Sequence, residues 1–336
     1  MSGSICGSKA NPQLAIVVPA FKSAYLGKAL QSILQQTDQR FRLYVGDDAS
    51  PQPIEKITRG FSFDSTQLVY HRFEENLGSR SLTAQWQRCV ALSHEPWIWL
   101  FSDDDVMEPE CVSAFYRALE RTRDEYDVYH FNTVYIDTGD ALIEILPPHP
   151  DWESWKTFTY FFLRGLRFST AQELILSRKA YERVGGFVDF PLAWGSDQAT
   201  LMALAGESGI GHIPGARVRF RMSGQNISSS RDRRLDLQKI DAARQLCLWI
   251  LRQIERVPDP HFELGDEVLR DEVLVWFKQH LAALHTWLTP AQCVRLAQFI
   301  KENWGKSFSA SLARMARLDA LMVPYALERI LKQRRV

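Results

Sequence analysis

Short apolar runs alternate with stretches of helical periodicity in the N-terminal part of the chain. Residues 14–19, Leu-Ala-Ile-Val-Val-Pro, are continuous, apolar and rich in β-branched side chains, as in a strand buried on both faces. Further runs predict strands at 41–45, 67–73 and 97–101, and the segments between them predict helices at 25–36, 51–61 and 81–93. This alternation predicts a parallel sheet with right-handed crossovers.

The pattern loosens after Asp105 and becomes helical after about residue 235. Between these points we expect helices at 109–123, 178–184 and 197–205 and strands at 126–136, 174–176 and 217–221, with an aromatic segment at 151–168. We therefore predict a flexible N-terminus over residues 1–12, an α/β domain over 13–230 and a C-terminal helical region over 235–336.

Composition narrows the classes of function. The 336 residues are 46% apolar and 24% charged, as in a soluble globular protein, and 40 Lys and Arg balance 40 Asp and Glu, so no net field favours nucleic acid. We find no apolar stretch of the ~20 residues that span a bilayer. The five scattered cysteines predict reduced thiols in a cytoplasmic protein.

Two groups of aspartates follow apolar runs. Asp47 and Asp48 come after the second predicted strand, and Asp103, Asp104 and Asp105 come after the fourth. Carboxyl ends of parallel strands meet at one edge of a sheet, where ligands bind. Adjacent carboxylates repel unless a cation or hydrogen-bond donors lie between them. The two groups therefore indicate a site for a metal-bound, phosphorylated ligand.

Five segments in a fixed order resemble the family 2 glycosyltransferases. They are 16–21 (Ile-Val-Val-Pro-Ala-Phe), 46–50 (Gly-Asp-Asp-Ala-Ser), 76–78 (Asn-Leu-Gly), 102–105 (Ser-Asp-Asp-Asp) with Pro109, and 185–187 (Gly-Gly-Phe) followed by Asp197. The resemblance implies an α/β GT-A fold, which is Rossmann-like with a mostly parallel sheet flanked by helices, here followed by a helical appendage. It also implies inverting sugar transfer from a nucleoside-diphosphate donor, foremost a UDP-sugar, to a hydroxyl acceptor.

The resemblance assigns roles to the residues at the sheet edge. Nucleotide contacts fall on Pro19, Phe21, Asp47, Asp48, Asp103 and Arg221, with the Phe21 ring against the base and Arg221 near the diphosphate. Alignment on Pro109 places Asp104 at the ligand of a divalent cation, Mg²⁺ or Mn²⁺, with Asp103 or Asp105 assisting. A hard cation of this kind binds carboxylate and diphosphate oxygens together.

The resemblance also locates the catalytic base and the acceptor side. Asp197 matches the base that removes the acceptor's proton, and Asp189 is the competing acid. Trp152, Trp155 and Trp194 are the candidates for stacking on the acceptor, although aromatic clusters more often form cores. Ser102, Ser196 and Ser223 stand where many members carry Asp, Glu and His.

Several alternatives stay open at this point. The acceptor is expected to be a saccharide or lipid-linked saccharide in surface polysaccharide assembly, and the alternative is a catalytically impaired nucleotide-sugar-binding or scaffold protein. The tail at 301–336 combines an apolar face with basic residues, which suits a packed helix or peripheral contact with an anionic membrane. Dimerisation through the helical region is a further alternative.

Overall fold

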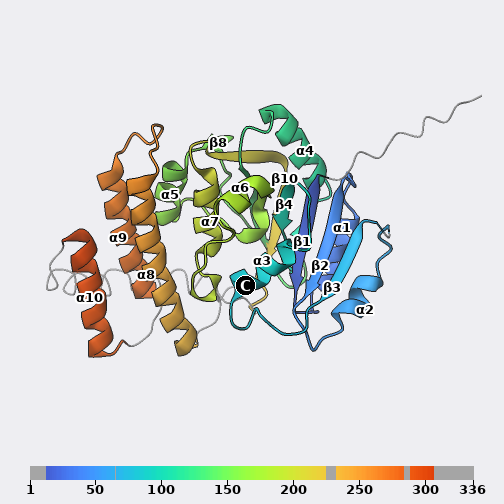
Figure 1. The fold of residues 1–336 in the computed structure, drawn as a ribbon, viewed down its shortest axis with the longest axis horizontal. Coiled ribbons are helices and arrows are strands. Elements are labelled where there is room, and N and C mark those ends of the chain that lie inside the picture. Colours follow the sequence, from blue (N-terminus) through green and yellow to red (C-terminus); the bar gives the residue numbers. More distant parts are fainter. Residues whose placement is uncertain (1–12, 65, 225–231, 284–287, 306–336) are drawn as a thin grey trace, which may run out of the picture.

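The computed structural model describes residues 13–64, 66–224, 232–283 and 288–305 (Figure 1). The strands are β1 (Leu14–Ala20), β2 (Phe41–Asp47), β3 (Leu68–Arg72), β4 (Trp97–Leu100), β5 (Val106–Met107), β6 (Val128–Ile136), β7 (Leu142–Ile145), β8 (Trp152–Glu153), β9 (Leu174–Ser177) and β10 (Ile210–Arg221). The α-helices are α1 (Leu26–Leu34), α2 (Ile54–Arg59), α3 (Leu82–Val90), α4 (Cys111–Thr122), α5 (Trp155–Leu163), α6 (Arg178–Arg183), α7 (Ser196–Ala205), α8 (Arg233–Arg256), α9 (Asp266–Ala283) and α10 (Pro290–Trp304). Short 3₁₀ helices lie at Ala171–Glu173 and Pro191–Ala193.

The ten strands form one mixed sheet in the order β3-β2-β1-β4-β9-β6-β10-β5, with β7 paired to β6 and β8 to β10. The first four neighbours, β3, β2, β1 and β4, are parallel, whereas β9 runs antiparallel to both β4 and β6. The predicted α/β fold is confirmed, and its parallel part is the one that the alternating pattern of strands and helices predicts.

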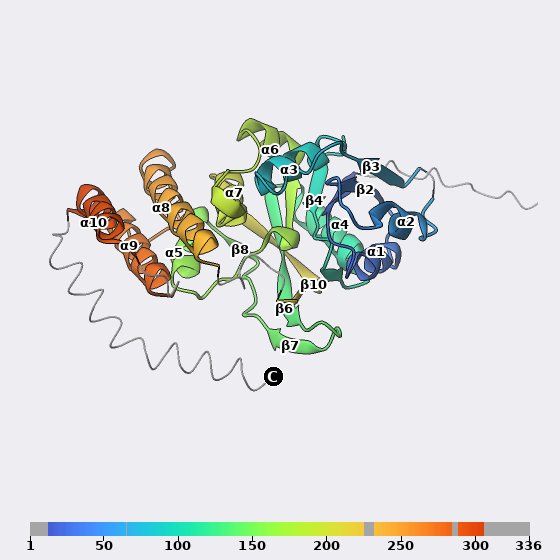
Figure 2. The same cartoon turned by 90° about the horizontal axis from the view of Figure 1, so that it is seen from below.

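Alternate side chains of β1 pack into two separate apolar clusters, one on each face of the sheet. Ala15 and Val17 face one apolar cluster, and Leu14, Ile16 and Val18 face the other, all at 0% exposure. Residues of α1 and α4 join the second cluster, and residues of α5, α7 and α8 join the first, so helices cover both faces (Figure 2). A strand enclosed on both faces reads as a continuous apolar run, which is the pattern at residues 14–19.

Local chemistry sets several helix starts. The side chain of Ser81 accepts a hydrogen bond from the amide of Ala84 at the start of α3, and Ser154 does the same for Thr157 at the start of α5. The aromatic segment at 151–168 divides into β8 and α5. The last strand begins at Ile210 rather than at residue 217, because β10 continues past an irregularity between Ile213 and Arg217.

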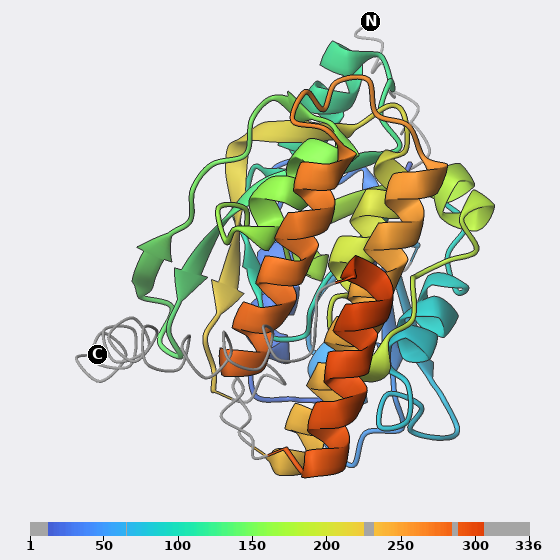
Figure 3. The same ribbon diagram turned by 90° about the vertical axis from the view of Figure 1, so that its left-hand side faces the viewer.

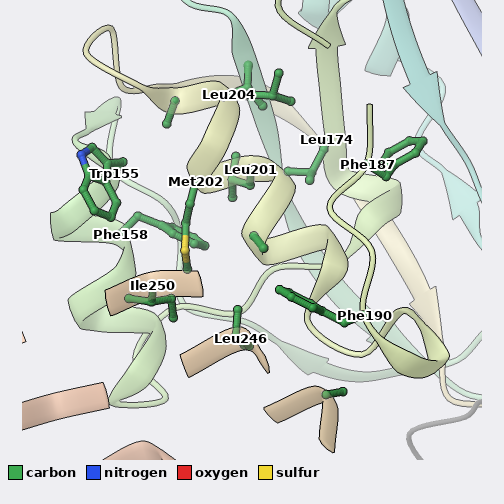
Figure 4. Packing of buried hydrophobic residues seen from close by; sticks show 14 of the residues in the cluster. Trp155, Phe158, Leu174, Phe187, Phe190, Leu201, Met202, Leu204, Leu246 and Ile250 are labelled. Atoms are coloured by element: carbon green, nitrogen blue, oxygen red, sulfur yellow. The ribbon is translucent and has the colours of Figure 1, made fainter. Parts of the chain in front are cut away.

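The three C-terminal helices lie side by side at one end of the molecule (Figure 3). Leu246 and Ile250 of α8 belong to the same buried cluster as Met202 of α7 and Phe158 of α5 (Figure 4). The helical region therefore shares a core with one face of the sheet. Residues 1–12 and the tail at 306–336, for which we expect a flexible N-terminus and an amphipathic segment, lie outside the described residues. Over the described part of the chain, no helix combines the length and hydropathy that a membrane span needs.

Candidate active site

Phe21 and the two groups of aspartates gather where β1, β2 and β4 end. The loops after these three parallel strands carry Phe21, Asp48 and Asp103, and the amide of Asp48 donates to the carbonyl of Ala20 at 3.0 Å. The hydroxyl of Ser50 donates to the carbonyl of Phe21 at 2.5 Å, which joins the first two loops. The edge of the sheet therefore presents one continuous group of loops, as the sequence predicts.

Asp103 holds the loop that follows β1. Its Oδ2 accepts hydrogen bonds from the amides of Phe21 and Lys22, each at 2.9 Å. Burial raises the pKa of Asp103 to about 6, and the two amide donors oppose that shift. Phe21 is 36% exposed, so its ring lies at the surface, on the loop whose backbone Asp103 holds. A surface ring at this place can stack on a flat base.

Asp104 and Asp105 differ in their surroundings. Asp104 is partly buried, and its pKa is raised by burial, while Lys22 and Arg221 act in the opposite direction. Asp105 is buried, its Oδ1 accepts from the amide of Arg221 at 2.7 Å, and the Ser102 side chain lies close to it. Among the described residues, its Oδ2 has no hydrogen-bond partner. Burial and the neighbouring Asp104 raise the pKa of Asp105 well above its usual range.

This arrangement fits a divalent cation. Asp104 offers a partly exposed carboxylate, and Oδ2 of Asp105 is a buried acceptor that a cation would satisfy. Hard cations such as Mg²⁺ and Mn²⁺ bind such oxygen donors. Asp103 is the least suited of the three to ligate metal, because one of its oxygens already serves two backbone amides.

The expectation that Arg221 pairs directly with phosphate is wrong in this structure. Its side chain is 0% exposed and bonds internally: Nε donates to the carbonyl of Asp104 and Nη1 to that of Asp137, both at 2.8 Å, and Nη2 lies 2.6 Å from Oδ1 of Asp140. The guanidinium also lies over the ring of Tyr25, 4.5 Å from its centroid. Arg221 therefore holds the backbone of the aspartate loop through these hydrogen bonds. Its burial keeps the guanidinium out of contact with a ligand.

Asp47 and Asp48 are both buried and both accept hydrogen bonds from protein donors. Oδ2 of Asp47 accepts from the Tyr70 hydroxyl and from Arg72 Nη1, each at 2.6 Å. Oδ1 of Asp48 accepts from the Leu77 amide at 2.8 Å and from Arg88 Nη2 at 2.5 Å. These contacts hold the loop after β2 against β3 and the loop before α3, and direct contact of Asp48 with a base or ribose stays a prediction. Pro19, partly buried on β1 opposite Gly46, lies just before these loops.

Asp197 begins α7, in the first turn of the helix. Its Oδ1 accepts from the amide of Gln198 at 3.1 Å, and burial, with a smaller contribution from Glu173, raises its pKa to about 7. Asp189 is exposed, and one of its oxygens accepts from the hydroxyl of Thr83. A pKa near neutrality suits a general base. The environment of Asp197 therefore fits the role of the base better than the exposed position of Asp189 does.

The three tryptophans have unequal access. Trp155 is 1% exposed within the core of α5, α7 and α8, so its expected stacking on an acceptor is wrong in this structure (Figure 4). Trp152 is partly buried and donates from Nε1 to the carbonyl of Ser208 at 2.8 Å. Trp194 is partly exposed beside Lys239 and His280. For these two, acceptor contact stays a prediction.

Sequence reasoning missed four cationic or phenolic groups at this edge: Lys22, Tyr70, Arg72 and Arg88. The Arg72 side chain is 46% exposed while it pairs with the buried Asp47, so its outer face remains accessible. Arg88 lies over the Phe73 ring, 3.9 Å from its centroid, and pairs with Asp48. Arg72 is the last residue of the parallel strand β3, just as Asp47 is the last residue of β2. Its position at a strand end in the sequence could have identified it as a residue of this edge.

A family model provides the first comparison with known proteins. Residues 15–184 match the model described as glycosyl transferase family 2, and this match covers half of the chain. The chain belongs to glycosyl transferase family 2. The matched range includes both aspartate groups and β1 to β4, and it ends before Asp197.

A curated relative and two solved structures are also similar. An uncharacterized glycosyltransferase of Haemophilus influenzae is 28% identical over 121 residues, which are 35% of this chain and only 38% of that relative. The S. aureus protein TarS, solved with UDP-GlcNAc, matches with a TM-score of 0.62 and 14% identity over 86% of this chain and 81% of that one. The mannosyltransferase PcManGT of Pyrobaculum calidifontis, solved with GDP-Man and Mn²⁺, has a TM-score of 0.54 and 16% identity over 96% and 85% of the two chains. At these identities the structural matches establish the GT-A fold.

Proposed function

We propose that this protein transfers a sugar, with inversion, from a nucleoside-diphosphate donor to a hydroxyl group. The observation that supports the proposal is the pair of hydrogen bonds from the amides of Phe21 and Lys22 to Asp103, which join the loop that carries the exposed Phe21 to the loop that carries Asp104. A base-stacking ring and a cation-binding carboxylate on adjacent loops match the two ends of a nucleoside diphosphate. Asp104 would bind the divalent cation, with Asp105 assisting through Oδ2.

The reaction that we propose depends on two acidic positions, the base Asp197 and the cation ligand Asp104. Asp197 would take the proton of the acceptor hydroxyl as its oxygen attacks the anomeric carbon, while the bond from that carbon to the diphosphate breaks. A bound cation supplies Lewis-acid stabilisation of the leaving diphosphate. Asp103 keeps the loop of Phe21 and Lys22 in place, and Arg221 holds the backbone of the aspartate loop.

A UDP-sugar is the donor that we propose to test first. TarS, which shares the fold, was solved with UDP-GlcNAc, whereas the similar PcManGT was solved with GDP-Man. The acceptor would be a saccharide or lipid-linked saccharide in surface polysaccharide assembly, on the resemblance of the sequence to its family. A cytoplasmic location, peripheral membrane contact and a homodimer belong to the same proposal.

The experiment measures release of nucleoside diphosphate from UDP-, GDP- and dTDP-sugars with Mn²⁺, Mg²⁺ or EDTA, in parallel with donor binding by calorimetry. We expect metal-dependent release from one donor, reduced at least ~100-fold in Asp104→Ala. The matched control is Glu74→Gln, which alters an exposed acid outside the aspartate group and should leave turnover unchanged. Absence of both release and metal-dependent binding with every donor would overturn the proposal.

One specific feature favours a second function. Ser102, Ser196 and Ser223 replace acidic or imidazole residues that are common in the family, which suits a nucleotide-sugar-binding or scaffold protein without turnover. That protein would bind a donor in the presence of metal but release no diphosphate with any acceptor supplied. Turnover that depends on Asp197 would exclude it.

A further inference from the structure

A group of buried imidazole and carboxylate side chains lies apart from the aspartates of the sheet edge. Its members are His130 on β6, His149 after β7, Glu153 on β8, and two neighbours, Glu173 and His212. All five are between 0% and 7% exposed. His130 and His212 occupy paired positions on β6 and β10, and the two rings are 6.0 Å apart. Three strands (β6, β8 and β10), the 3₁₀ helix Ala171–Glu173 and the segment after β7 thus meet at this group.

Most imidazole nitrogens of this group have no hydrogen-bond partner among the described residues. Among the described residues, neither ring nitrogen of His130 has a hydrogen-bond partner, and the same holds for both ring nitrogens of His212 and for Nδ1 of His149. Buried polar atoms in native proteins nearly always have a partner, so this set indicates a missing ligand. Oε1 of Glu173 also lacks a partner.

Three of these side chains have the geometry of metal ligands. One donor atom each from His130, His149 and Glu153 lies within 4.8 Å of the other two. The rings of His130 and His149 are stacked, with centroids 3.7 Å apart and an interplanar angle of 29°. Ligand atoms of a tetrahedral zinc are about 3.4 Å apart, which requires side-chain movements of roughly 1 Å.

His149 lies between two carboxylates in the manner of a metal-ligating histidine. Its Nδ1 is 3.9 Å from Oε1 of Glu153, and its Nε2 is 3.5 Å from Oε1 of Glu173. With Nδ1 on a metal, the Nε2–H would donate to Glu173, and such a carboxylate commonly fixes the tautomer and orientation of a ligating imidazole. Thr133 already donates to the other oxygen of Glu173 at 2.8 Å.

The charge balance of the group leaves room for a cation. Glu153 and Glu173 bring two negative charges, and Arg167, with Nε 3.3 Å from both oxygens of Glu153, supplies one positive charge. The remaining negative charge requires a bound cation, a proton on an imidazole or a proton on one of the two carboxylates. The stacked imidazoles of His130 and His149 cannot both be positively charged without a large cost in free energy, because like charges at that distance repel.

We propose that His130, His149 and Glu153 bind a divalent transition metal, Zn²⁺ before others, as a structural centre that ties the segment after β7 and strand β8 to β6. Two histidines and one glutamate are the protein ligands of catalytic zinc sites, where water takes the fourth position, and two histidines with one carboxylate also bind Fe²⁺. Catalytic sites keep an open position for substrate, whereas these ligands are enclosed, which favours a structural role. Imidazole selects transition metals over Mg²⁺, so this site and the aspartate site would prefer different cations.

The experiment uses the full chain carrying Asp104→Ala, so that the proposed nucleotide-site cation does not contribute. Metal content is measured after purification without chelator, and Co²⁺ binding to the metal-free protein is followed by its visible d–d absorption. We expect one equivalent of Zn²⁺ or Fe²⁺ as isolated, one equivalent of Co²⁺ bound with tetrahedral or five-coordinate absorption, and no displacement by excess Mg²⁺. Saturation with Zn²⁺ should raise Tm by about 4 °C at a hundredfold excess over Kd.

Variants and a control assign the ligands. In the same background, His149→Asn, His130→Asn and Glu153→Gln should each lose the metal and the absorption, while exposed His94→Asn should retain both. Because the ligand variants could fail to fold, the measurement on Asp104→Ala alone also decides the question. A protein that neither contains nor takes up a transition metal, and whose Tm does not respond to Zn²⁺ or EDTA, would overturn the proposal in favour of a protonated, hydrogen-bonded group. Binding that survives the His130 and His149 substitutions would overturn it as well.

Discussion

The amide of Gly78 donates to Oδ2 of Asp48 at 2.9 Å, and a Cβ at position 78 would lie only 2.6 Å from that same oxygen. Asp48 is buried and accepts on its other oxygen from Leu77 and Arg88. The close approach of backbone to carboxylate is therefore possible only without a side chain at 78, and it joins the end of β2 to the loop before α3.

We expect Gly78→Ala to weaken donor binding about tenfold, because the alanine methyl group would displace the Asp48 carboxylate and the loop it holds. Calorimetric titration of donor in the presence of metal measures the effect. Gly27→Ala is the matched control, since a Cβ there meets nothing within 4 Å. Equal donor affinity in Gly78→Ala and wild type would contradict a role of this loop in donor binding.

Asp103→Ala should raise the donor KM about tenfold with a smaller change in kcat. The substitution leaves the amides of Phe21 and Lys22 without their acceptor, so the loop that presents the ring loses its fixed position. Steady-state kinetics with varied donor measures the split between KM and kcat. Asp64→Ala, which removes an exposed acid that also accepts from a backbone amide, should change neither constant.

Arg221→Met should lower both stability and apparent metal affinity, although Arg221 reaches no ligand itself. The change removes the donor to the carbonyls of Asp104 and Asp137 and the partner of Asp140, at a cost of about 2–4 kcal/mol in the free energy of unfolding. Chemical denaturation and Mn²⁺ titration measure the two effects. Arg219→Met, which removes a bond to the carbonyl of Asp140, should be milder. Unchanged stability with reduced donor affinity would instead indicate direct phosphate contact.

Activity should depend on pH through Asp197. Burial raises its pKa to about 7, and a general base acts only when deprotonated, so kcat/KM should rise tenfold per pH unit below about 7 and level off above it. Asp197→Asn should lose at least ~100-fold in activity and the pH dependence of what remains. Asp189→Asn should keep the wild-type profile, and the opposite pattern would make Asp189 the base.

Stability should change with pH in the opposite direction. The folded protein holds the Asp197 proton more tightly than the unfolded chain, so this group's contribution to stability is present at low pH and is lost as pH rises toward about 7. Asp197→Asn avoids the buried charge, and above pH ~7 its Tm should equal or exceed that of wild type. A large loss of Tm in the variant would show that Asp197 is needed for folding and would weaken the kinetic test.

The sequence by itself determined the strands and the edge at which the site forms. The positions of β1 to β4 were predicted correctly. β1 and β4 are enclosed on both faces and are therefore apolar throughout, whereas the edge strand β3 is only partly buried. Asp48 and Asp103 follow β2 and β4 because parallel strands end at one edge of the sheet. Chain order alone therefore placed Phe21, Asp48 and Asp104 on neighbouring loops.

Tertiary structure decided which side chains are accessible, because burial depends on packing between distant segments. Helices α7 and α9 pack against α5, where Trp155 is 1% exposed, and Asp104, Asp137 and Asp140 enclose the Arg221 guanidinium, so neither can meet a ligand as expected. The buried group of His130, His149 and Glu153 likewise comes together from separated strands and a loop, and nothing in its sequence spacing indicated it.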